Sequence, residues 1–107
     1  MTIYLAGPMT GLPEHNTPAF DHAEALLTNL GYTVLSPARM LREHPRDSIR
    51  EHLARDVEAI CSADAIVLLP GWETSPGVAL EIHLAEYLAL RGEALPRWTL
   101  AEVLEAA

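Results

Sequence analysis

Two carboxylates stand where helices ordinarily present apolar residues. Asp56 follows Ile49 by seven positions, so on an ideal helix, at about 100° per residue, the two lie within roughly 20° of each other. Glu81 lies in the same way between the directions of Ala85 and Leu88. An acid on an inward face is costly unless it is paired or faces a cleft. Two such acids favour a shared polar cleft, although a helix end that overhangs the core would also leave an acid in water.

Paired carboxylates in different surroundings can divide the work of nucleophile and proton donor. Glu81 lies in the first turns of its predicted helix, where the helix dipole favours the ionised form that a nucleophile needs. Apolar surroundings would raise the pKa of Asp56, so that this residue could protonate a leaving group.

An anion site is predicted just before Glu81. Ser75, Pro76 and Gly77 lead into a helix N-terminus, whose free N–H groups attract phosphate. Ser75 adds a hydroxyl, and Gly77 lets a ligand approach the backbone. Serine is also a common helix N-cap, so a purely structural role for Ser75 stays open.

The elements that position these residues follow from periodicity and turn signals. The runs "TIYLAG", "YTVLS" and "AIVLL" predict strands, and "EALPRW" a weak fourth strand in which Pro96 suits a sheet edge. Helix signals alternate with them. The first helix is predicted by an N-cap at Thr17 and an apolar stripe from Phe20 to Leu30. The second is predicted by the capping box "SIRE" and an inner stripe of Ile49, Leu53, Val57 and Ile60. A third helix is expected from about Gly77 to Leu90, and the capping box "TLAE" predicts a short one near the C-terminus.

This alternation predicts an α/β fold, a three-layer α/β/α sandwich around a parallel, flavodoxin- or Rossmann-like sheet of four or five strands. Residues 1–107 are expected to form a single domain. Ligands of such sheets bind at the carboxyl ends of the strands, so the loops after the first three strands should meet there. The first of these loops supplies Gly7, Pro8, Met9 and Asn16 as candidate binding residues, and the third supplies Trp72.

Two of these assignments carry alternatives. Met9 and Trp72 could flank a nucleobase, although Trp72 could equally form a subunit contact. Asn16 could bind the ligand or could fix its own loop through a side-chain to backbone hydrogen bond.

Charge and composition restrict the partners. A net charge of −8 with only seven Lys and Arg argues against a nucleic-acid polymer. Arg39, Arg42, Arg46 and Arg50 could meet a small anion or form a solvated helix and loop. The five histidines show no metal-ligand spacing, so neither a metal nor another cofactor is expected. No run approaches a membrane span and Cys61 is the single cysteine, so the expected compartment is the cytoplasm.

Three motifs in this order resemble the nucleoside 2-deoxyribosyltransferase superfamily, which includes the deoxynucleoside 5′-monophosphate N-hydrolases. They are "IYLAGP", "RDVEAICSADAIVLL" and "SPGVALE". The longer stretches "YLAGPMTGLPEHNTPAF" and "LPGWETSPGVALE" are similar to a compact, often phage-associated branch, and the resemblance covers most of residues 1–91.

The resemblance implies roles for four residues. Glu81 would be the nucleophile, Tyr4 would orient it, Asp56 would handle the leaving base, and Ser75 would bind a 5′-phosphate. The superfamily is usually dimeric or larger, so a homodimer or higher homo-oligomer is expected. The transferases carry an Asp where Ser75 or Pro76 stands, and no residue of "EALPRWTLAEVLEAA" can be assigned to a neighbouring subunit's site.

The expected function is cleavage of the N-glycosidic bond of a (deoxy)nucleoside 5′-monophosphate or nucleoside through a covalent glycosyl–Glu81 ester, as a hydrolase or a deoxyribosyltransferase. The alternative is a non-catalytic nucleotide-binding or sensor module on the same fold. A ribonucleotide phosphoribohydrolase of the cytokinin-activating type ranks last, because its "PGGxGTxxE" motif has Gly-Thr where this chain has Gly77 and Val78.

Overall fold

The computed structural model describes residues 1–107 as an alternation of strands and helices. The strands are β1 (Thr2–Ala6), β2 (Thr33–Leu35), β3 (Ala65–Leu68) and β4 (Arg97–Thr99). The helices are α1 (Thr17–Asn29), α2 (Pro37–Glu43), α3 (Ile49–Ser62), α4 (Pro76–Leu90) and α5 (Leu100–Ala106), with short 3₁₀ turns η1 (Pro13–Asn16) and η2 (Trp72–Thr74).

All four strands pair in parallel, in the order β2-β1-β3-β4. Tyr4 of β1 lies opposite Leu35 of β2 and Ile66 of β3, so it occupies the centre of the sheet. The weak fourth strand exists and forms an edge, with Pro96 immediately before it. The predicted parallel α/β sheet is therefore confirmed with four strands.

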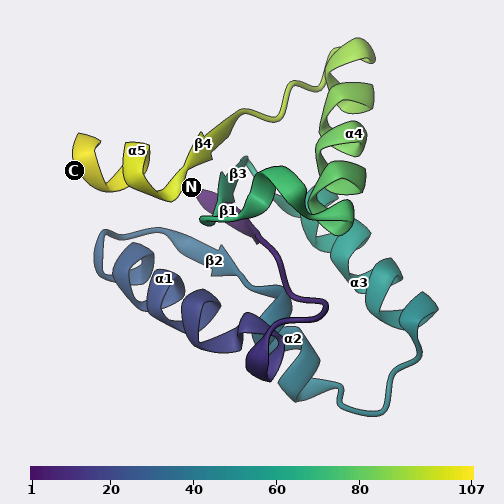
Figure 1. Ribbon diagram of the computed structural model, residues 1–107. Helices are drawn as coiled ribbons and strands as arrows, with labels where there is room; N and C mark the ends of the chain where they lie inside the picture. Colours follow the sequence, from purple (N-terminus) through teal and green to yellow (C-terminus); the bar gives the residue numbers. More distant parts are fainter.

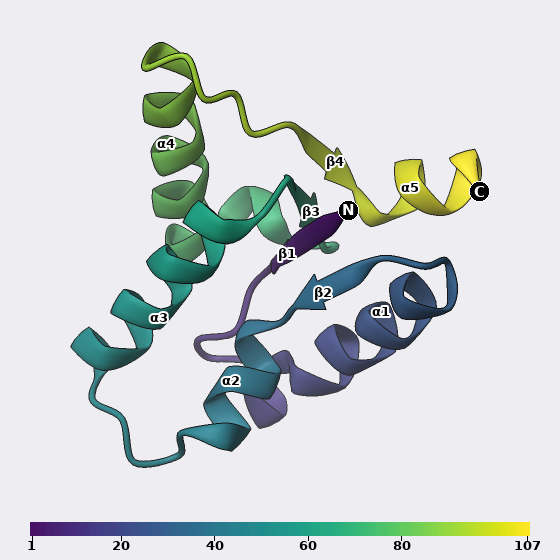
Figure 2. The ribbon, with the colours of Figure 1, turned by 180° about the vertical axis from the view of Figure 1, so that it is seen from behind.

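Helices cover both faces of this sheet, because successive strand residues point to opposite sides. In Figures 1 and 2, α1 and α5 lie on one side of the strands and α3 and α4 on the other. The first layer buries Ile3, Leu5 and Val67 of the sheet against Phe20 and Leu27 of α1 and Val103 of α5. The second layer buries Tyr4, Ala6, Ile66 and Leu68 against Ile60 of α3 and Val78 and Ala85 of α4.

The prediction for α3 is wrong along most of its inner stripe. Ile60 is buried, but Ile49, Leu53 and Val57 are 86%, 43% and 37% exposed. The reason is that helical phase gives a direction and not the length of the surface beneath it. The sheet and its neighbours cover the C-terminal end of α3, and its N-terminal half projects beyond them (Figure 1).

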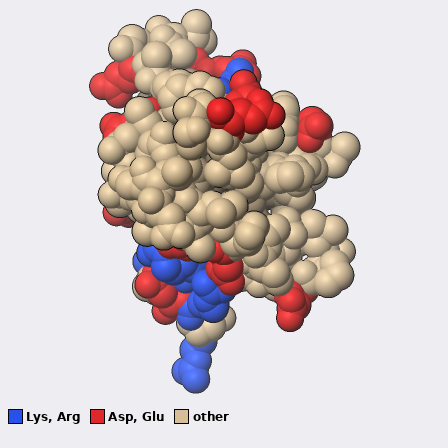
Figure 3. All heavy atoms as spheres, turned by 90° about the vertical axis from the view of Figure 1, so that its left-hand side faces the viewer, with Lys and Arg blue, Asp and Glu red and all other residues tan.

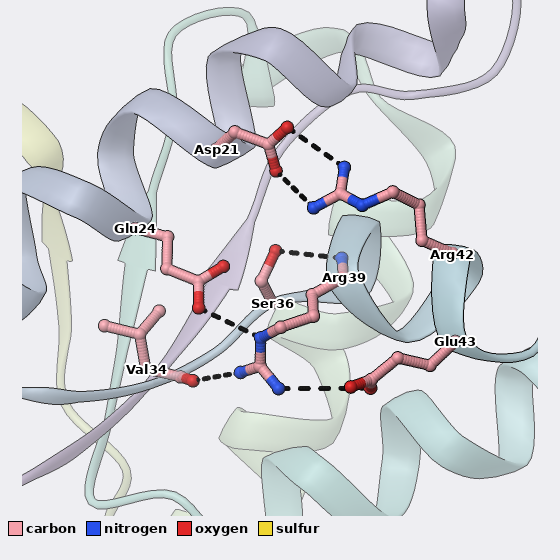
Figure 4. Close-up of polar contacts among 7 residues, drawn as sticks. All are labelled: Asp21, Glu24, Val34, Ser36, Arg39, Arg42 and Glu43. Carbon is pink, nitrogen blue, oxygen red and sulfur yellow. Dashed lines mark hydrogen bonds and ion pairs between the residues drawn. The ribbon is translucent and has the colours of Figure 1, made fainter.

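The arginine-rich segment includes α2, which periodicity did not distinguish from a loop. Figure 4 shows how ion pairs hold this helix on α1: Arg42 meets both carboxylate oxygens of Asp21, and Arg39 meets Glu24 at 2.9 Å. In Figure 3 the basic side chains at the lower end of the molecule are interleaved with acidic ones. Arg39 and Arg42 therefore have structural partners within the chain.

Helix starts are partly as predicted. The capping boxes at Ser48 and Thr99 are confirmed, since each serine or threonine accepts from the backbone three residues later and the glutamate there accepts in return. The first helix differs, because Asn16 and not Thr17 occupies its N-cap.

None of the helices combines the length and the apolar character that a membrane span needs.

Candidate active site

A cleft of about 860 Å³ lies at the carboxyl ends of the strands. The loops after the first three strands all contribute to it, as predicted: Met9 follows β1, Pro37 follows β2, and Gly71 follows β3. Its volume falls in the range of small-molecule sites, roughly 300 to 1,000 Å³. Nine sequence-predicted residues line the cleft: Tyr4, Gly7, Pro8, Met9, Asn16, Asp56, Ser75, Gly77 and Glu81.

Tyr4 and Glu81 are in direct contact at the floor of this cleft. The Tyr4 hydroxyl donates a hydrogen bond to Oε2 of Glu81, which comes from the second turn of α4. Tyr4 is fully buried in the centre of the sheet, so its hydroxyl is a fixed point. Burial raises the pKa of Tyr4 well above its ordinary value, and the negative charges of Glu81 and Asp56 raise it further. The phenol therefore stays neutral and acts as a hydrogen-bond donor.

Asp56 lines the same cleft from α3 and is half-buried. Burial raises its pKa from an ordinary 3.8 to about 6, and the nearby His52 acts in the opposite direction. This carboxyl group can therefore carry a proton just below neutral pH, which is the property predicted for a group that protonates a leaving base.

Glu81 differs from the expectation of a fully ionised carboxylate. Burial raises its pKa from 4.5 to about 7; the hydrogen bond from Tyr4 lowers it and the charge of Asp56 raises it. Loss of water around the carboxylate outweighs the favourable end of the helix dipole. Both acids thus titrate close to neutrality, and the ionisation of one opposes that of the other.

The start of α4 forms one wall. Ser75 is its N-cap, and its Oγ accepts from the backbone N–H of Val78 at 3.3 Å. The structural role left open for Ser75 is therefore filled, and its hydroxyl hydrogen is still available to a ligand. A Cβ built on Gly77 would meet only Ser75 Oγ, at 3.8 Å, so packing within the chain does not require glycine there.

The loop after β1 forms the facing wall and is strained. Glu14, His15 and Asn16 all have positive φ angles, of 54°, 54° and 61°, although none of them is glycine. Asn16 Nδ2 donates to the carbonyl of Pro8 at 2.9 Å, and Thr17 Oγ1 donates to the carbonyl of Glu14 at 2.9 Å. The loop-fixing alternative for Asn16 is thus realised at a position that also borders the cleft.

Gly7 has a packing role as well. A Cβ at this position would lie 2.9 Å from Cβ of Leu69, so only glycine lets the chain leave β1 beside β3.

Trp72 is the one predicted binding residue that does not line the cleft. Its half-buried side chain packs against the cluster of Tyr4, Ala6, Val78 and their neighbours. The indole packs on the core beside the turn η2 and lies outside the cleft lining, so the prediction that it flanks a nucleobase has no support in the shape of the cleft.

Nine further lining residues were not among the predicted binding residues. These are Thr10, Leu12, Pro37, Leu53, Pro70, Gly71, Thr74, Pro76 and Leu80. Most lie in the three loops that were expected to meet, so loop membership could have found them. Leu53 could have been found by its position three residues before Asp56 on the same helix.

No group of three or more His, Cys, Asp or Glu side chains is placed to hold a metal ion.

Comparison with known families gives a match over residues 1–91 to the model of a domain of unknown function, DUF4406. The chain belongs to the DUF4406 family. No curated protein matches this DUF4406 chain.

Solved structures with the same fold are 2-deoxyribosyltransferases. The enzyme from Bacillus psychrosaccharolyticus is similar at 27% identity and a TM-score of 0.67, over 92% of the DUF4406 chain and 72% of the enzyme. The enzyme from Leishmania mexicana shares the fold at 22% identity and a TM-score of 0.64, over 92% of the DUF4406 chain and 63% of the enzyme. The resemblance to the nucleoside 2-deoxyribosyltransferase superfamily is therefore confirmed in the structure.

Proposed function

We propose that this DUF4406 protein cleaves the N-glycosidic bond of a (deoxy)nucleoside 5′-monophosphate or nucleoside through a covalent ester on Glu81. The observation that carries the proposal is the hydrogen bond from the buried Tyr4 to Glu81 inside a cleft that Asp56 also lines. The fold shared with 2-deoxyribosyltransferases supports the substrate class.

In the first step a carboxylate oxygen of Glu81 bonds to C1′ of the sugar while the bond from C1′ to the base nitrogen breaks. The electron pair of that bond passes to the base, which takes the proton of Asp56. Tyr4 holds the carboxylate in one orientation throughout. In the second step water attacks C1′, its proton returns to Asp56, and Glu81 leaves as a carboxylate. A second base in place of water would make the protein a transferase.

Ser75 and Gly77 favour a 5′-monophosphate over a free nucleoside. The start of α4 lines the cleft, and free backbone N–H groups at a helix start attract phosphate. Ser75 adds a donor, and the open space over Gly77 leaves room for the phosphate group. In this scheme the phosphate is anchored at α4 while C1′ lies over Glu81, one turn further along the same helix.

The proposal includes the ligand, the assembly and the compartment of the protein. We place a small-molecule nucleotide in the cleft of a single domain spanning residues 1–107, within a homo-oligomer. The single, exposed Cys61 is consistent with the reducing cytoplasm.

The test is chromatography of free bases after incubation with a panel of ribo- and deoxyribonucleotides and their nucleosides. Wild-type protein should release at least one base, and Glu81→Gln should release it at least about a thousandfold more slowly. A nucleotide that raises the melting temperature but is recovered intact would overturn catalysis and favour the nucleotide-binding module. Faster release from AMP than from dAMP would favour the ribonucleotide-specific enzyme.

A matched pair of serine variants tests the monophosphate. Ser75→Ala and Ser48→Ala each remove an N-cap that accepts at 3.3 Å and 3.2 Å, so each should lose about 1 kcal/mol of stability. Only Ser75→Ala should raise KM for the nucleotide relative to the nucleoside. Equal effects of the two variants on that ratio would remove Ser75 from the phosphate site.

A further inference from the structure

The cleft contains two carboxyl groups and no cationic side chain. Its lining includes Asp56 and Glu81 but no Lys, Arg or His. Tyr4 is the third titratable group of the lining, and its buried phenol is neutral. His52, one turn before Asp56 on α3, lies outside the lining, and no ion pair joins Asp56 or Glu81 to a cation. The ionised carboxylates therefore have no cation of the chain inside the cleft.

The cationic side chains are held elsewhere in the molecule. The sequence has no lysine, and four of its seven arginines pair with carboxylates outside the cleft. Arg39 and Arg42 hold α2 on α1 (Figure 4), and Arg55 meets Asp47. With a net charge of −8 around it, the cleft is negative whenever its own acids are ionised.

Two parts of the cleft present opposite charge to a ligand. The start of α4, with Ser75 and Gly77, carries the positive end of the helix dipole. Asp56 and Glu81 carry the negative charge. A ligand that matches both parts has a phosphate group at one end and a positive charge at the other. A nucleotide with a neutral base matches only the first part.

We propose that the preferred substrates of this cleft are 5′-nucleotides whose base carries a fixed positive charge, such as a pyridinium ring or an N-alkylated purine. This inference rests on the proposed function, because it names the class of base that Glu81 displaces. Opposite charges attract more strongly in a partly buried site than in water, so the ionised carboxylates favour a cationic base over a neutral one.

A cationic base also removes the need for a proton donor. A carboxylate oxygen of Glu81 bonds to C1′ while the bond from C1′ to the ring nitrogen breaks, and the electron pair of that bond neutralises the positive ring. The base leaves as a neutral molecule. Water then attacks C1′, Glu81 leaves as a carboxylate, and the proton of the water passes through Asp56 to the solvent.

This cleavage continues when both acids are ionised. Burial raises the pKa of Asp56 to about 6 and that of Glu81 to about 7, so both are mostly charged at pH 8. For a cationic base the rate should therefore rise with pH to a plateau. For a neutral base it should pass through a maximum, because the proton donor is lost on the alkaline side.

Nicotinamide mononucleotide and its reduced form are matched probes of this preference, because they share one framework and differ by a hydride and the charge of the ring. Isothermal titration at pH 8 uses Glu81→Gln, which stops turnover and keeps the charge of Asp56. The oxidised form should bind at least about tenfold more tightly than the reduced form. The 2′-deoxy forms of both probes are titrated in the same way, so the 2′-hydroxyl does not decide the result.

Two further substitutions in the Glu81→Gln protein locate the charge. Asp56→Asn should abolish the preference. The control is Glu73→Gln, at an exposed position of η2 outside the lining, which removes the same charge from the chain and should leave the preference intact.

Turnover is measured with Glu81 in place. Wild-type protein should release nicotinamide from the oxidised probe at pH 8. Asp56→Asn should lower kcat for a neutral-base nucleotide at least about a hundredfold and kcat for nicotinamide release less than about tenfold, because only the neutral base needs a proton.

Three results would overturn this inference and leave the proposed function standing: equal affinities for the two probes, a preference that survives Asp56→Asn, or release of neutral bases without release of nicotinamide. Release of no base from any nucleotide, neutral or cationic, would instead overturn the proposed function, and with it the cleavage inferred here.

Discussion

The hydroxyl of Tyr4 donates a hydrogen bond to the carboxylate of Glu81, 77 residues further along the chain. One partner is anchored in the central strand and the other in the second turn of a helix, so the fold itself sets the orientation of the carboxylate. A nucleophile held in this way loses little freedom when the substrate arrives.

Replacing Tyr4 by Phe should slow base release without unfolding the protein. The lost hydrogen bond to a charged group corresponds to a drop of about tenfold to a hundredfold in kcat. That bond also lowers the pKa of Glu81, which is the higher of the two carboxyl pKa values, so its loss should move the basic limb of the pH profile to higher pH. Tyr32→Phe, at a half-buried tyrosine in the opposite layer, is the matched control and should leave the profile in place.

The dependence of kcat on pH should be a narrow bell with its maximum between pH 6 and 7, the values to which burial raises the pKa of Asp56 and Glu81. Below this range both carboxyl groups are protonated and no nucleophile remains. Above it both are ionised and no proton donor remains.

Asp56→Asn provides the control for this profile. A 5′-phosphate itself titrates near pH 6, so one limb could come from the substrate. The variant should retain only the ionisations of Glu81 and of the phosphate. A wild-type rate that is flat across the neutral range would contradict the roles of both acids.

The helices show what the sequence could and could not predict. Asp56 and Glu81 were found by helical phase because side-chain direction on a helix is an intrinsic property. Ile49 and Leu53 were assigned to the core by the same rule, and that assignment failed because phase does not reveal where the neighbouring surface ends. Phase is local, whereas burial depends on the rest of the molecule.

The loops were harder to predict than the helices. That three loops would meet followed from the parallel sheet. The orientation of Trp72 and the left-handed turn at Glu14 and His15 did not follow from the sequence, because a local run of residues fixes neither a side-chain direction nor three successive positive φ angles. They depend on tertiary contacts such as the hydrogen bond from Asn16 to Pro8.

Gly77→Ala should separate binding from stability. Because a Cβ there meets only ordinary contact within the chain, α4 should be unchanged or more stable by up to about 1 kcal/mol. The added methyl group occupies space in the cleft, so KM for a nucleotide should rise about tenfold while the free nucleoside is less affected. Isothermal titration with both ligands measures the difference, and equal affinities in wild type and variant would contradict a phosphate over Gly77.

Positive φ angles in the turn at Glu14 and His15 should lower the free energy of unfolding, and replacing either residue by glycine should raise it. Glu14→Gly or His15→Gly should raise the free energy of unfolding by about 1 kcal/mol, since glycine adopts positive φ without steric strain. His22→Gly, at an exposed position inside α1, is the matched control and should lower it by about as much. Chemical denaturation of the three variants decides the sign, and destabilisation by all three would contradict strain in the turn.

Rapid acid quenching followed by peptide mass spectrometry tests the central claim most directly. Protein mixed with a nucleotide that it cleaves and quenched within the first turnover should carry one sugar phosphate on the peptide that contains Glu81. The adduct should be absent from Glu81→Gln. Release of base with the sugar attached to another residue, or undiminished release by Glu81→Gln, would contradict Glu81 as the nucleophile.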